Sequence, residues 1–144
     1  MTTDIGADRK RLGVRILTPE GSVYRGNATM VVAPSILGEV GILPRHAPLI
    51  AFLKPGETRV KTLDDQTIVM ATGEGYLSVE EDQVLVLVEQ AERAEDIDRA
   101  RAQNALEHAN TLIEAAGEDQ AALRQAEAAR RRAENRLRVA DRPR

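Results

Sequence analysis

The most constraining feature of this 144-residue sequence is a change of character near residue 90. Before that point, short runs of Val, Ile, Leu and Thr alternate with Gly, Pro and Asp. After it, Ala, Glu and Arg dominate, and proline is absent until Pro143. β-branched runs favour strands, whereas Ala-rich segments favour helices. The sequence therefore predicts a disordered lead-in over residues 1–10, a β domain over residues 11–91 and a helical domain over residues 92–144.

The β part of the sequence is divided by recognisable turns. Thr18-Pro19-Glu20-Gly21 has Pro and Gly where a type I turn favours them. Asp64-Asp65 and Glu80–Gln83 each separate two apolar runs, so each is expected to close a hairpin. Short strands with regular turns favour an antiparallel β-sandwich, or flattened barrel. Because aromatic residues make up only 2% of the chain, we expect a core of Val, Ile, Leu and Ala.

The helical part predicts two helices in an antiparallel αα-hairpin. Asp96 is the expected N-cap of the first helix, Gly117 ends it, and Asp119 can cap the second. Apolar residues recur at three- and four-residue steps, which is the period of a helix face. These residues are Ala102, Leu106, Ala109, Ile113 and Ala116 in the first helix, and Ala122, Ala126, Ala129, Ala133, Leu137 and Ala140 in the second. A seam of alanine buries little apolar area. The hairpin is therefore either marginal and able to open towards a partner, or a permanently docked tail.

Composition excludes several classes of function. The chain has no cysteine, so it forms no disulfide and no cysteine-based metal site. Its net charge of −3 gives no general attraction to nucleic acid. No apolar run approaches the roughly 20 residues that a membrane-spanning helix needs. We therefore expect no metal, no nucleic-acid partner and no direct membrane insertion.

The stretch LGEVGILPRHAPLI, residues 37–50, contains His46 between two prolines. Catalysis would need a partner base, nucleophile or metal ligand, and the only other histidine, His108, falls in the predicted helical domain. We therefore predict no catalytic residue. Two alternatives remain open. His46 either ties down the backbone of its own loop, or belongs to a recognition surface built on this glycine- and proline-shaped loop.

The segment IDRARA, residues 97–102, carries charged groups of opposite sign. Asp98 and Arg101 share a helix face, where a carboxylate can accept from an amino group and a guanidinium can bind phosphate. If the chain turns near Gly117, residues whose numbers sum to roughly 235 lie level, which places Arg132 and Arg136 near this pair. The alternative is that Asp98 only favours the helix N-terminus and pairs with Arg101. No glycine-rich phosphate loop is present, so hydrolysis is not predicted.

The second predicted helix is rich in arginine. One interpretation is a solvated face with local ion pairs to Glu127 and Glu134. Nucleic acid is disfavoured because the stretch lacks aromatic residues for stacking. An acidic protein surface fits best. The arginines concerned are Arg130, Arg131, Arg132, Arg136 and Arg138.

Taken together, the β-rich first part, the run GEVGILPRHAPLIAFLKPG and the Ala/Arg hairpin resemble the epsilon subunit of a bacterial-type F-type ATP synthase. The most specific part is the Gly-x-x-Gly-Ile-x-Pro-x-His-Ala-Pro pattern from Gly38 to Pro48. The junction VLVLVEQAERAEDID is also similar to that family. One departure is Gly73-Glu74-Gly75, where many members have adjacent glycines, and it leaves the local turn open.

The resemblance implies a non-catalytic central-stalk subunit of a proton-translocating synthase, peripheral on the cytoplasmic face of the cell inner membrane. Its β domain would link the gamma subunit to the membrane rotor ring of c subunits, which Glu39, Arg45 and His46 would contact. Its hairpin would inhibit ATP hydrolysis by meeting an acidic segment in the catalytic head of alpha and beta subunits, with the five arginines as the contact. The alternative is a free-standing nucleotide-sensing adaptor module of the same architecture.

The resemblance also implies a nucleotide site. Ile97, Asp98, Arg101 and Ala102 match the motif with which bacterial epsilon subunits bind ATP without hydrolysing it. Arg132 and Arg136 would then bind the phosphates, and Glu92 would join the adenine side. No cofactor is required on this reading, and ATP is a regulatory ligand.

Overall fold

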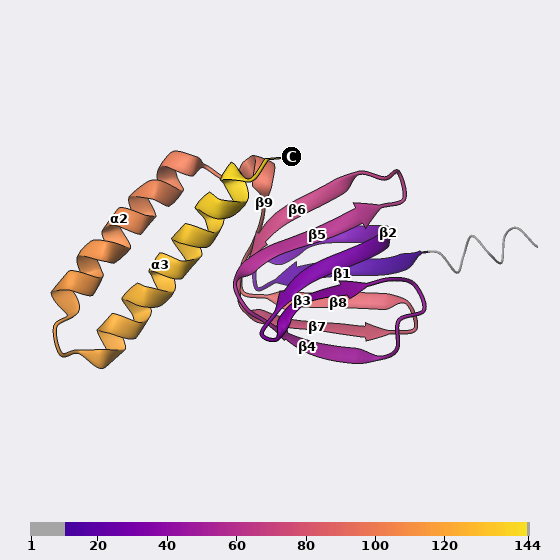
Figure 1. The fold of residues 1–144 in the computed structure, drawn as a ribbon, viewed down its shortest axis with the longest axis horizontal. Helices are drawn as coiled ribbons and strands as arrows, with labels where there is room; N and C mark the ends of the chain where they lie inside the picture. Colours follow the sequence, from indigo (N-terminus) through magenta and orange to yellow (C-terminus); the bar gives the residue numbers. More distant parts are fainter. Residues whose placement is uncertain (1–10, 144) are drawn as a thin grey trace, which may run out of the picture. The chain divides into compact units, whose positions relative to one another are not determined.

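The computed structural model describes residues 11–143, so the predicted disordered lead-in over residues 1–10 lies outside the described residues. The chain divides into two units, one ending at Arg93 and one beginning at Ala94 (Figure 1). This division falls two residues after the expected boundary at residue 91. Residues 91–93 form a short strand paired with the rest of the β unit, and that pairing extends the unit.

Residues 11–93 form nine strands. They are β1 (Leu12–Thr18), β2 (Gly21–Ser35), β3 (Gly38–Ile42), β4 (Leu49–Leu53), β5 (Gly56–Thr62), β6 (Thr67–Thr72), β7 (Gly75–Glu80), β8 (Gln83–Val88) and β9 (Ala91–Arg93). The strand order is β1-β8-β7-β4-β2-β5-β6-β9, with β3 also paired to β2. Since β1 pairs with both β8 and β2, the strands close on themselves, and the predicted flattened barrel is confirmed.

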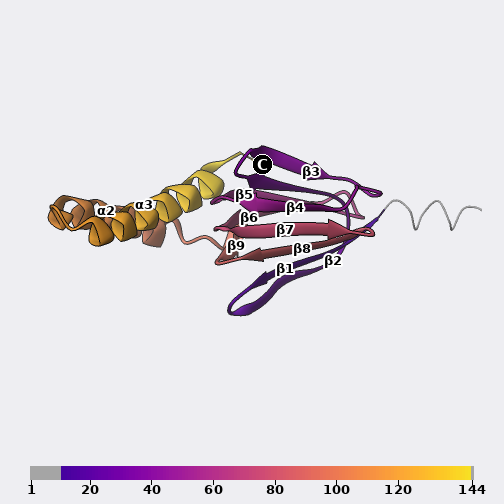
Figure 2. The same cartoon turned by 90° about the horizontal axis from the view of Figure 1, so that it is seen from below.

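Strand β2 is long enough to pair with strands on both sides of the β unit. Its first half pairs with β1 and its second half pairs with β5 and β3. Figure 2 shows β3 and β1 on opposite sides of the β unit. One detail differs from the prediction: β1 and β8 run parallel, in a sheet that is otherwise antiparallel. No short turn joins these two strands, so no hairpin geometry constrains their directions.

The core consists of aliphatic side chains, as the composition predicts. Alternate residues of β1 and β8 point inwards, for example Val14 and Ile16 on β1 and Val84 and Val86 on β8. The buried cluster is Leu12, Val14, Ile16, Ala28, Val31, Ala33, Ile42, Leu53, Val60, Met70, Leu77, Val79, Val84, Val86 and Val88. Period-two burial of this kind is typical of strands with one face in the core.

The predicted hairpin turns are confirmed. Asp64-Asp65 joins β5 to β6, and Asp65 has a φ of 61°. Glu81 and Asp82 join β7 to β8, with φ values of 49° and 62°. Two successive positive φ angles define the turn type whose twist matches that of a two-residue hairpin. The β7–β8 connection is therefore tight, and it presents the Asp82 side chain from a constrained backbone.

The helical unit contains a 3₁₀ turn, η1 (Ala94–Asp96), and two helices, α2 (Arg99–Ala116) and α3 (Gln120–Asp141). The expected N-cap at Asp96 is wrong: the cap is Asp98, whose Oδ1 accepts from the Arg101 N–H at 3.1 Å. The 3₁₀ turn occupies Asp96 and delays the start of the helix. Gly117 at the C-cap, with a φ of 55°, and Asp119 at the second N-cap are as predicted.

The two helices pack along small side chains, and the predicted hairpin is confirmed. Ala102 and Ala109 of α2 and Ala126 and Ala133 of α3 are buried, as expected for the alanine seam. Two further buried residues, Asn135 and Val139, were not predicted from the apolar period. Because alanine removes little surface from water, this seam contributes less than a leucine seam of equal length.

Candidate functional site

The loop of residues 43–48 connects β3 to β4. The His46 N–H donates to the Leu43 carbonyl at 3.2 Å, which closes a tight turn. Arg45 has a φ of 69°, a conformation that L-residues rarely adopt. Its N–H donates to Asp82 Oδ1 at 2.6 Å, and the Asp82 carbonyl accepts from the Gly13 N–H at 2.8 Å. Asp82 therefore ties the loop to the β7–β8 turn and to β1, a role that the sequence analysis missed.

The His46 ring is occupied within its own loop. Its Nδ1 lies 2.6 Å from the Ala47 carbonyl oxygen. Since a carbonyl only accepts, Nδ1 carries the proton and donates. This contact agrees with the alternative in which His46 ties down its loop. In residues 11–143, no three His, Asp or Glu side chains gather so that they could hold a metal ion.

Glu39 lies at the start of β3, whereas Arg45 and His46 follow the other end of that strand. Arg59 Nη1 bridges two carboxylates, Glu39 at 3.2 Å and Glu57 at 3.0 Å. Burial lowers the pKa of Arg59, but the hydrogen bonds and charges of Glu57 and Glu39 outweigh it and raise the pKa above its ordinary value. Arg59 is therefore a permanent cation that holds Glu39 in place. The structure does not bring Glu39 into the loop with Arg45 and His46.

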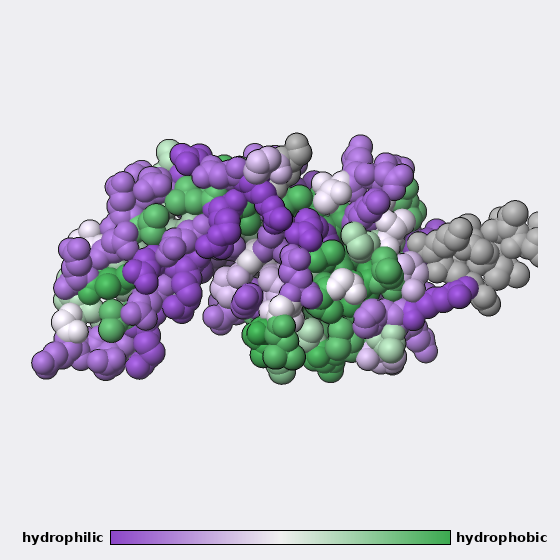
Figure 3. All heavy atoms as spheres, viewed as in Figure 1, coloured by the Kyte–Doolittle hydropathy of each residue, from purple (hydrophilic) through white to green (hydrophobic). Residues whose placement is uncertain are grey.

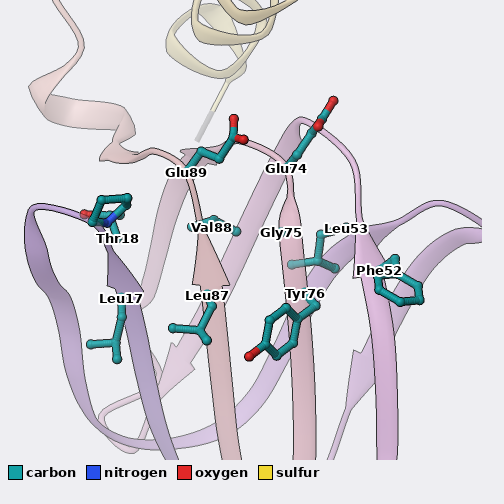
Figure 4. A pocket seen from close by; sticks show the side chains of 11 residues that line it. Leu17, Thr18, Phe52, Leu53, Glu74, Gly75, Tyr76, Leu87, Val88 and Glu89 are labelled. Atoms are coloured by element: carbon teal, nitrogen blue, oxygen red, sulfur yellow. The ribbon is translucent and has the colours of Figure 1, made fainter.

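An apolar row crosses the outer face of four strands in the β unit. Phe52 of β4 lies opposite Tyr76 of β7, Tyr76 opposite Leu87 of β8, and Leu87 opposite Leu17 of β1. Figure 4 shows these side chains along a groove of about 660 Å³, with Glu74 and Glu89 at one end. We call this set the apolar row. The sequence analysis did not single it out, although each residue alternates with core positions.

Other apolar side chains add to this exposed surface. Ile50 and Phe52 of β4 are 69% and 64% exposed, and Leu37 at the β2–β3 turn is 95% exposed. Figure 3 shows apolar side chains gathered at the lower side of the β unit, where Figure 1 places β4. Contiguous apolar surface on a folded protein marks a site of interaction. The β unit therefore presents a surface suited to a protein partner.

The residues of the IDRARA segment lie at the beginning of α2. The Asp98 carboxylate caps the helix through the Arg101 N–H. Ala102 is fully buried in the seam, whereas Ile97 is partly buried and Arg101 is exposed. Glu92 lies in β9 of the β unit, opposite Ala71. Capping, one of the two alternatives for Asp98, is therefore present in the structure.

The hairpin register determines which arginines lie level with this segment. Ala116 and Gln120 flank the turn, and their numbers sum to 236, close to the expected 235. On this register Arg136 is level with about residue 100, and Arg132 lies one turn further along. Both arginines are half-buried. The helical unit thus holds Arg136 at the same height as Asp98 and Arg101.

The remaining arginines of α3 differ in their surroundings. Arg130 pairs with Glu134 one turn away at 3.3 Å, as the solvated-face interpretation expects. Arg131 and Arg138 are exposed and lie seven residues apart, which places them on one face of the helix. Neither has an ion-pair partner among residues 11–143. These two side chains are available to a partner with negative charge.

Within residues 11–143, neither helix has an apolar stretch long enough to cross a bilayer.

Comparison with protein families matches both units. Residues 11–94 match the family model described as the β-sandwich domain of the ATP synthase delta/epsilon chain. Residues 95–141 match the model described as the long α-helix domain of the same chain. The boundary between the two matches lies within two residues of the boundary between the two units.

Individual relatives agree with this result. The chain is 43% identical over 131 residues to an ATP synthase epsilon chain from Halalkalibacterium halodurans, a match that covers 91% of this chain and 98% of the relative. It is 39% identical to an ATP synthase epsilon chain from Latilactobacillus sakei, covering 92% and 94%. A chain in the Euglena gracilis mitochondrial ATP synthase shares the fold, with a TM-score of 0.76, 20% identity and coverage of 88% and 79%.

Proposed function

This chain belongs to the ATP synthase epsilon chain family, and from that premise we propose that it links the gamma subunit to the membrane rotor ring and restrains ATP hydrolysis through its hairpin. Epsilon chains are non-catalytic subunits of ATP synthase. The observation that carries the inhibitory part is a weak alanine seam beside the exposed, unpaired Arg131 and Arg138. Such a helix loses little when it leaves its partner, and it gains charge-assisted contacts on an acidic surface.

The β unit is the proposed coupling element. Its apolar row suits a packed interface with gamma, because burial of aromatic and aliphatic side chains drives stable association. The loop of Arg45 and His46, together with Glu39, is the proposed contact with the polar loops of c subunits. Chains of this fold occur in a Tetrahymena thermophila assembly described as central stalk and c-ring, which supports the placement (TM-score 0.56, 13% identity). The subunit is then peripheral on the cytoplasmic face of the inner membrane.

Co-purification tests the coupling role. Tagged chain should bring down gamma, and a Phe52→Asp, Tyr76→Asp variant should lose gamma while keeping its fold. A Leu63→Asp variant is the control, because Leu63 is also exposed but lies in the β5–β6 turn, outside the apolar row. A chain that never retains gamma would instead favour a free-standing nucleotide-sensing adaptor.

ATPase activity of the assembled enzyme tests inhibition. Truncation after Arg93 keeps β9 intact and should raise ATP hydrolysis while coupled synthesis continues. Replacing Arg130, Arg131, Arg132, Arg136 and Arg138 with Ala should reproduce much of that rise. Replacing the same five with Lys keeps the charge and should largely retain inhibition. Equal activity for full-length, truncated and Ala-substituted chains would end the inhibitory proposal.

We further propose that the hairpin binds ATP as a regulatory ligand. We assign Ile97, Asp98, Arg101, Ala102, Arg132 and Arg136 of the helical unit to the site, with Arg136 on phosphate. ATP that binds only the closed hairpin would stabilise it by RT ln(1 + [ATP]/Kd) and so oppose inhibition. Arg136→Ala should weaken ATP binding about tenfold or more, as expected for the loss of a charged hydrogen bond.

The two N-caps of the hairpin give a matched test for Asp98. Asp98→Ala and Asp119→Ala each remove a side chain that caps a helix at 3.1 Å. Both should lower hairpin stability by about 1 kcal/mol. Only Asp98→Ala should weaken ATP binding in calorimetry beyond that common effect. Equal ATP affinity of the two variants would leave Asp98 as a cap alone, and no binding at millimolar ATP would remove the site.

A further inference from the structure

A bidentate ion pair joins the two ends of the hairpin. Arg99 Nε donates to Asp141 Oδ1 at 2.6 Å, and Arg99 Nη2 donates to Asp141 Oδ2 at 3.0 Å. Arg99 is the first residue of α2 and Asp141 is the last residue of α3. The pair therefore bridges the open end of the hairpin, opposite the turn at Gly117. Two parallel N–H···O bonds impose a definite geometry that a single contact does not.

Both charges stand at the unfavourable end of their own helix. The N-terminus of a helix carries partial positive charge, which favours anions, and the C-terminus carries partial negative charge, which favours cations. Arg99 is a cation at an N-terminus, and Asp141 is an anion at a C-terminus. Neither residue stabilises the helix that contains it. Each becomes favourable only when the two helix ends meet, so the pair favours the closed hairpin specifically.

The buried seam between the two helices is weak, so this ion pair can affect the equilibrium between the closed and the open hairpin. The seam is made largely of alanine, and near the open end the buried residues are Ala102 of α2 and Asn135 and Val139 of α3. The ion pair is itself exposed, since Arg99 and Asp141 retain 63% and 48% of their side-chain surface. Exposed pairs shift an equilibrium modestly. A modest shift still changes the open population when most of the buried side chains between the helices are alanines.

We propose that Arg99 and Asp141 form a clasp that sets how readily the hairpin opens. This clasp rests on the proposed inhibitory function, because it would determine the fraction of molecules whose hairpin is open and able to inhibit. Its effect on the hairpin itself does not depend on that function. Breaking either half frees the helix ends, and exchanging the two charges re-forms the bridge in reverse.

The absence of cysteine allows a clean measurement of opening on the full chain. Ala109 is buried in the middle of α2, away from fraying ends, so Ala109→Cys reacts with a thiol reagent only when the helices separate. All variants carry this reporter, so its own effect cancels. Arg99→Gln and Asp141→Asn should each raise the labelling rate about two- to fivefold, the range for an exposed ion pair. The double variant should equal either single variant.

Two further variants make the test decisive. Arg99→Asp combined with Asp141→Arg should return the labelling rate to that of the parent or lower, since the pair re-forms and both charges now suit their helix ends. Glu134→Gln, which breaks the ion pair with Arg130 within α3 alone, should leave the rate unchanged. Unchanged labelling in Arg99→Gln and Asp141→Asn, or fast labelling in the exchanged variant, would overturn the clasp.

ATPase assays of the assembled enzyme separate the clasp from the inhibitory function. If both proposals hold, Arg99→Gln and Asp141→Asn should lower ATP hydrolysis, and the exchanged variant should restore it. Faster labelling with unchanged hydrolysis would retain the clasp and overturn the inhibitory role of the hairpin.

Discussion

Asp82 links three segments of the β unit that are far apart in the sequence. Its carboxylate accepts from the Arg45 N–H, and its carbonyl accepts from the Gly13 N–H, so one side chain and one peptide join three segments. Arg45 and Asp82 both have positive φ angles, a combination that costs conformational energy unless the contact repays it. The loop proposed to contact the rotor ring is thus held by a turn far away in sequence.

We predict that Asp82→Ala lowers the free energy of unfolding by about 1.5 kcal/mol, because it leaves the Arg45 amide without its charged acceptor. Asp82→Asn keeps an acceptor oxygen and tolerates a positive φ, so it should retain most of the stability. Urea denaturation and hydrogen exchange of the Arg45 amide measure both effects. Equal losses for Ala and Asn would show that the carboxylate oxygen is not the anchor.

Gly75 is required by a close approach of two strands. A Cβ at this position would lie 1.8 Å from the Leu87 carbonyl oxygen of β8. We predict that Gly75→Ala costs at least about 3 kcal/mol, since a backbone atom rather than a flexible side chain must move. Gly73→Ala is the matched control, because its Cβ would meet only ordinary contacts from 3.5 Å. Similar melting temperatures for the two variants would contradict this assignment.

At the scale of elements, the hairpin combines strong local signals with weak packing. Both helices have aspartate N-caps, and α2 ends at a glycine, so their limits are set within a few residues. Small side chains line the seam between them, and the Arg99–Asp141 ion pair joins their ends. An element built in this way keeps its helices when it opens. That property suits a regulatory arm better than a structural one.

We predict that the hairpin loses stability on acidification through Asp141. The hydrogen bond from Arg99 chiefly lowers the pKa of Asp141 below its ordinary value of 3.8, against a small opposing effect of burial, and the charge of Arg99 adds to the lowering. A lowered folded pKa gives stability that is complete above the ordinary value and is lost as the pH falls through the folded value. The hairpin should therefore loosen below about pH 4.

Comparison of the parent with Asp141→Asn isolates this effect. Glu95 and Asp96 of η1, which packs against α3, are present in both proteins, so their contribution cancels. The difference in helical melting temperature between the two proteins, followed by circular dichroism, should shrink as the pH drops. A difference that stays constant from neutral to strongly acidic pH would exclude Asp141 as the titrating group.

At the scale of the whole molecule, the two units have separate cores. The β unit encloses a continuous aliphatic cluster, and the helical unit has its own seam. We predict that a fragment of residues 1–93 folds cooperatively and binds gamma. A fragment of residues 1–90 lacks β9 and its ladder with Met70–Thr72, so it should be less stable by about 1–2 kcal/mol. Urea denaturation compares them, and an unfolded 1–93 fragment would contradict the independence of the β unit.

Much of the fold could be predicted because its signals are local. The hairpin turns at Asp64-Asp65 and Glu80–Gln83, the helix end at Gly117 and the cap at Asp119 each depend on residues within one turn of the chain. The predicted N-cap of α2 is two residues too early because Asp96 is the last residue of the η1 turn, which directly precedes the helix. For the candidate site, helical geometry was enough to predict that Arg136 lies level with Asp98 in the hairpin, whereas no sequence pattern predicted the apolar row.

The sequence by itself determined the division into a β part and a helical part, the aliphatic core and the alanine seam, because periodicity and composition act over short stretches. Only the tertiary structure decided the parallel pairing of β1 with β8, the anchor from Asp82 to Arg45 and the bridge from Arg99 to Asp141. The paired residues are 37 positions apart in the chain for the anchor, 42 for the bridge and 70 for the β1–β8 pairing. Local propensity carries no information about such partners, which meet only once the whole chain has packed.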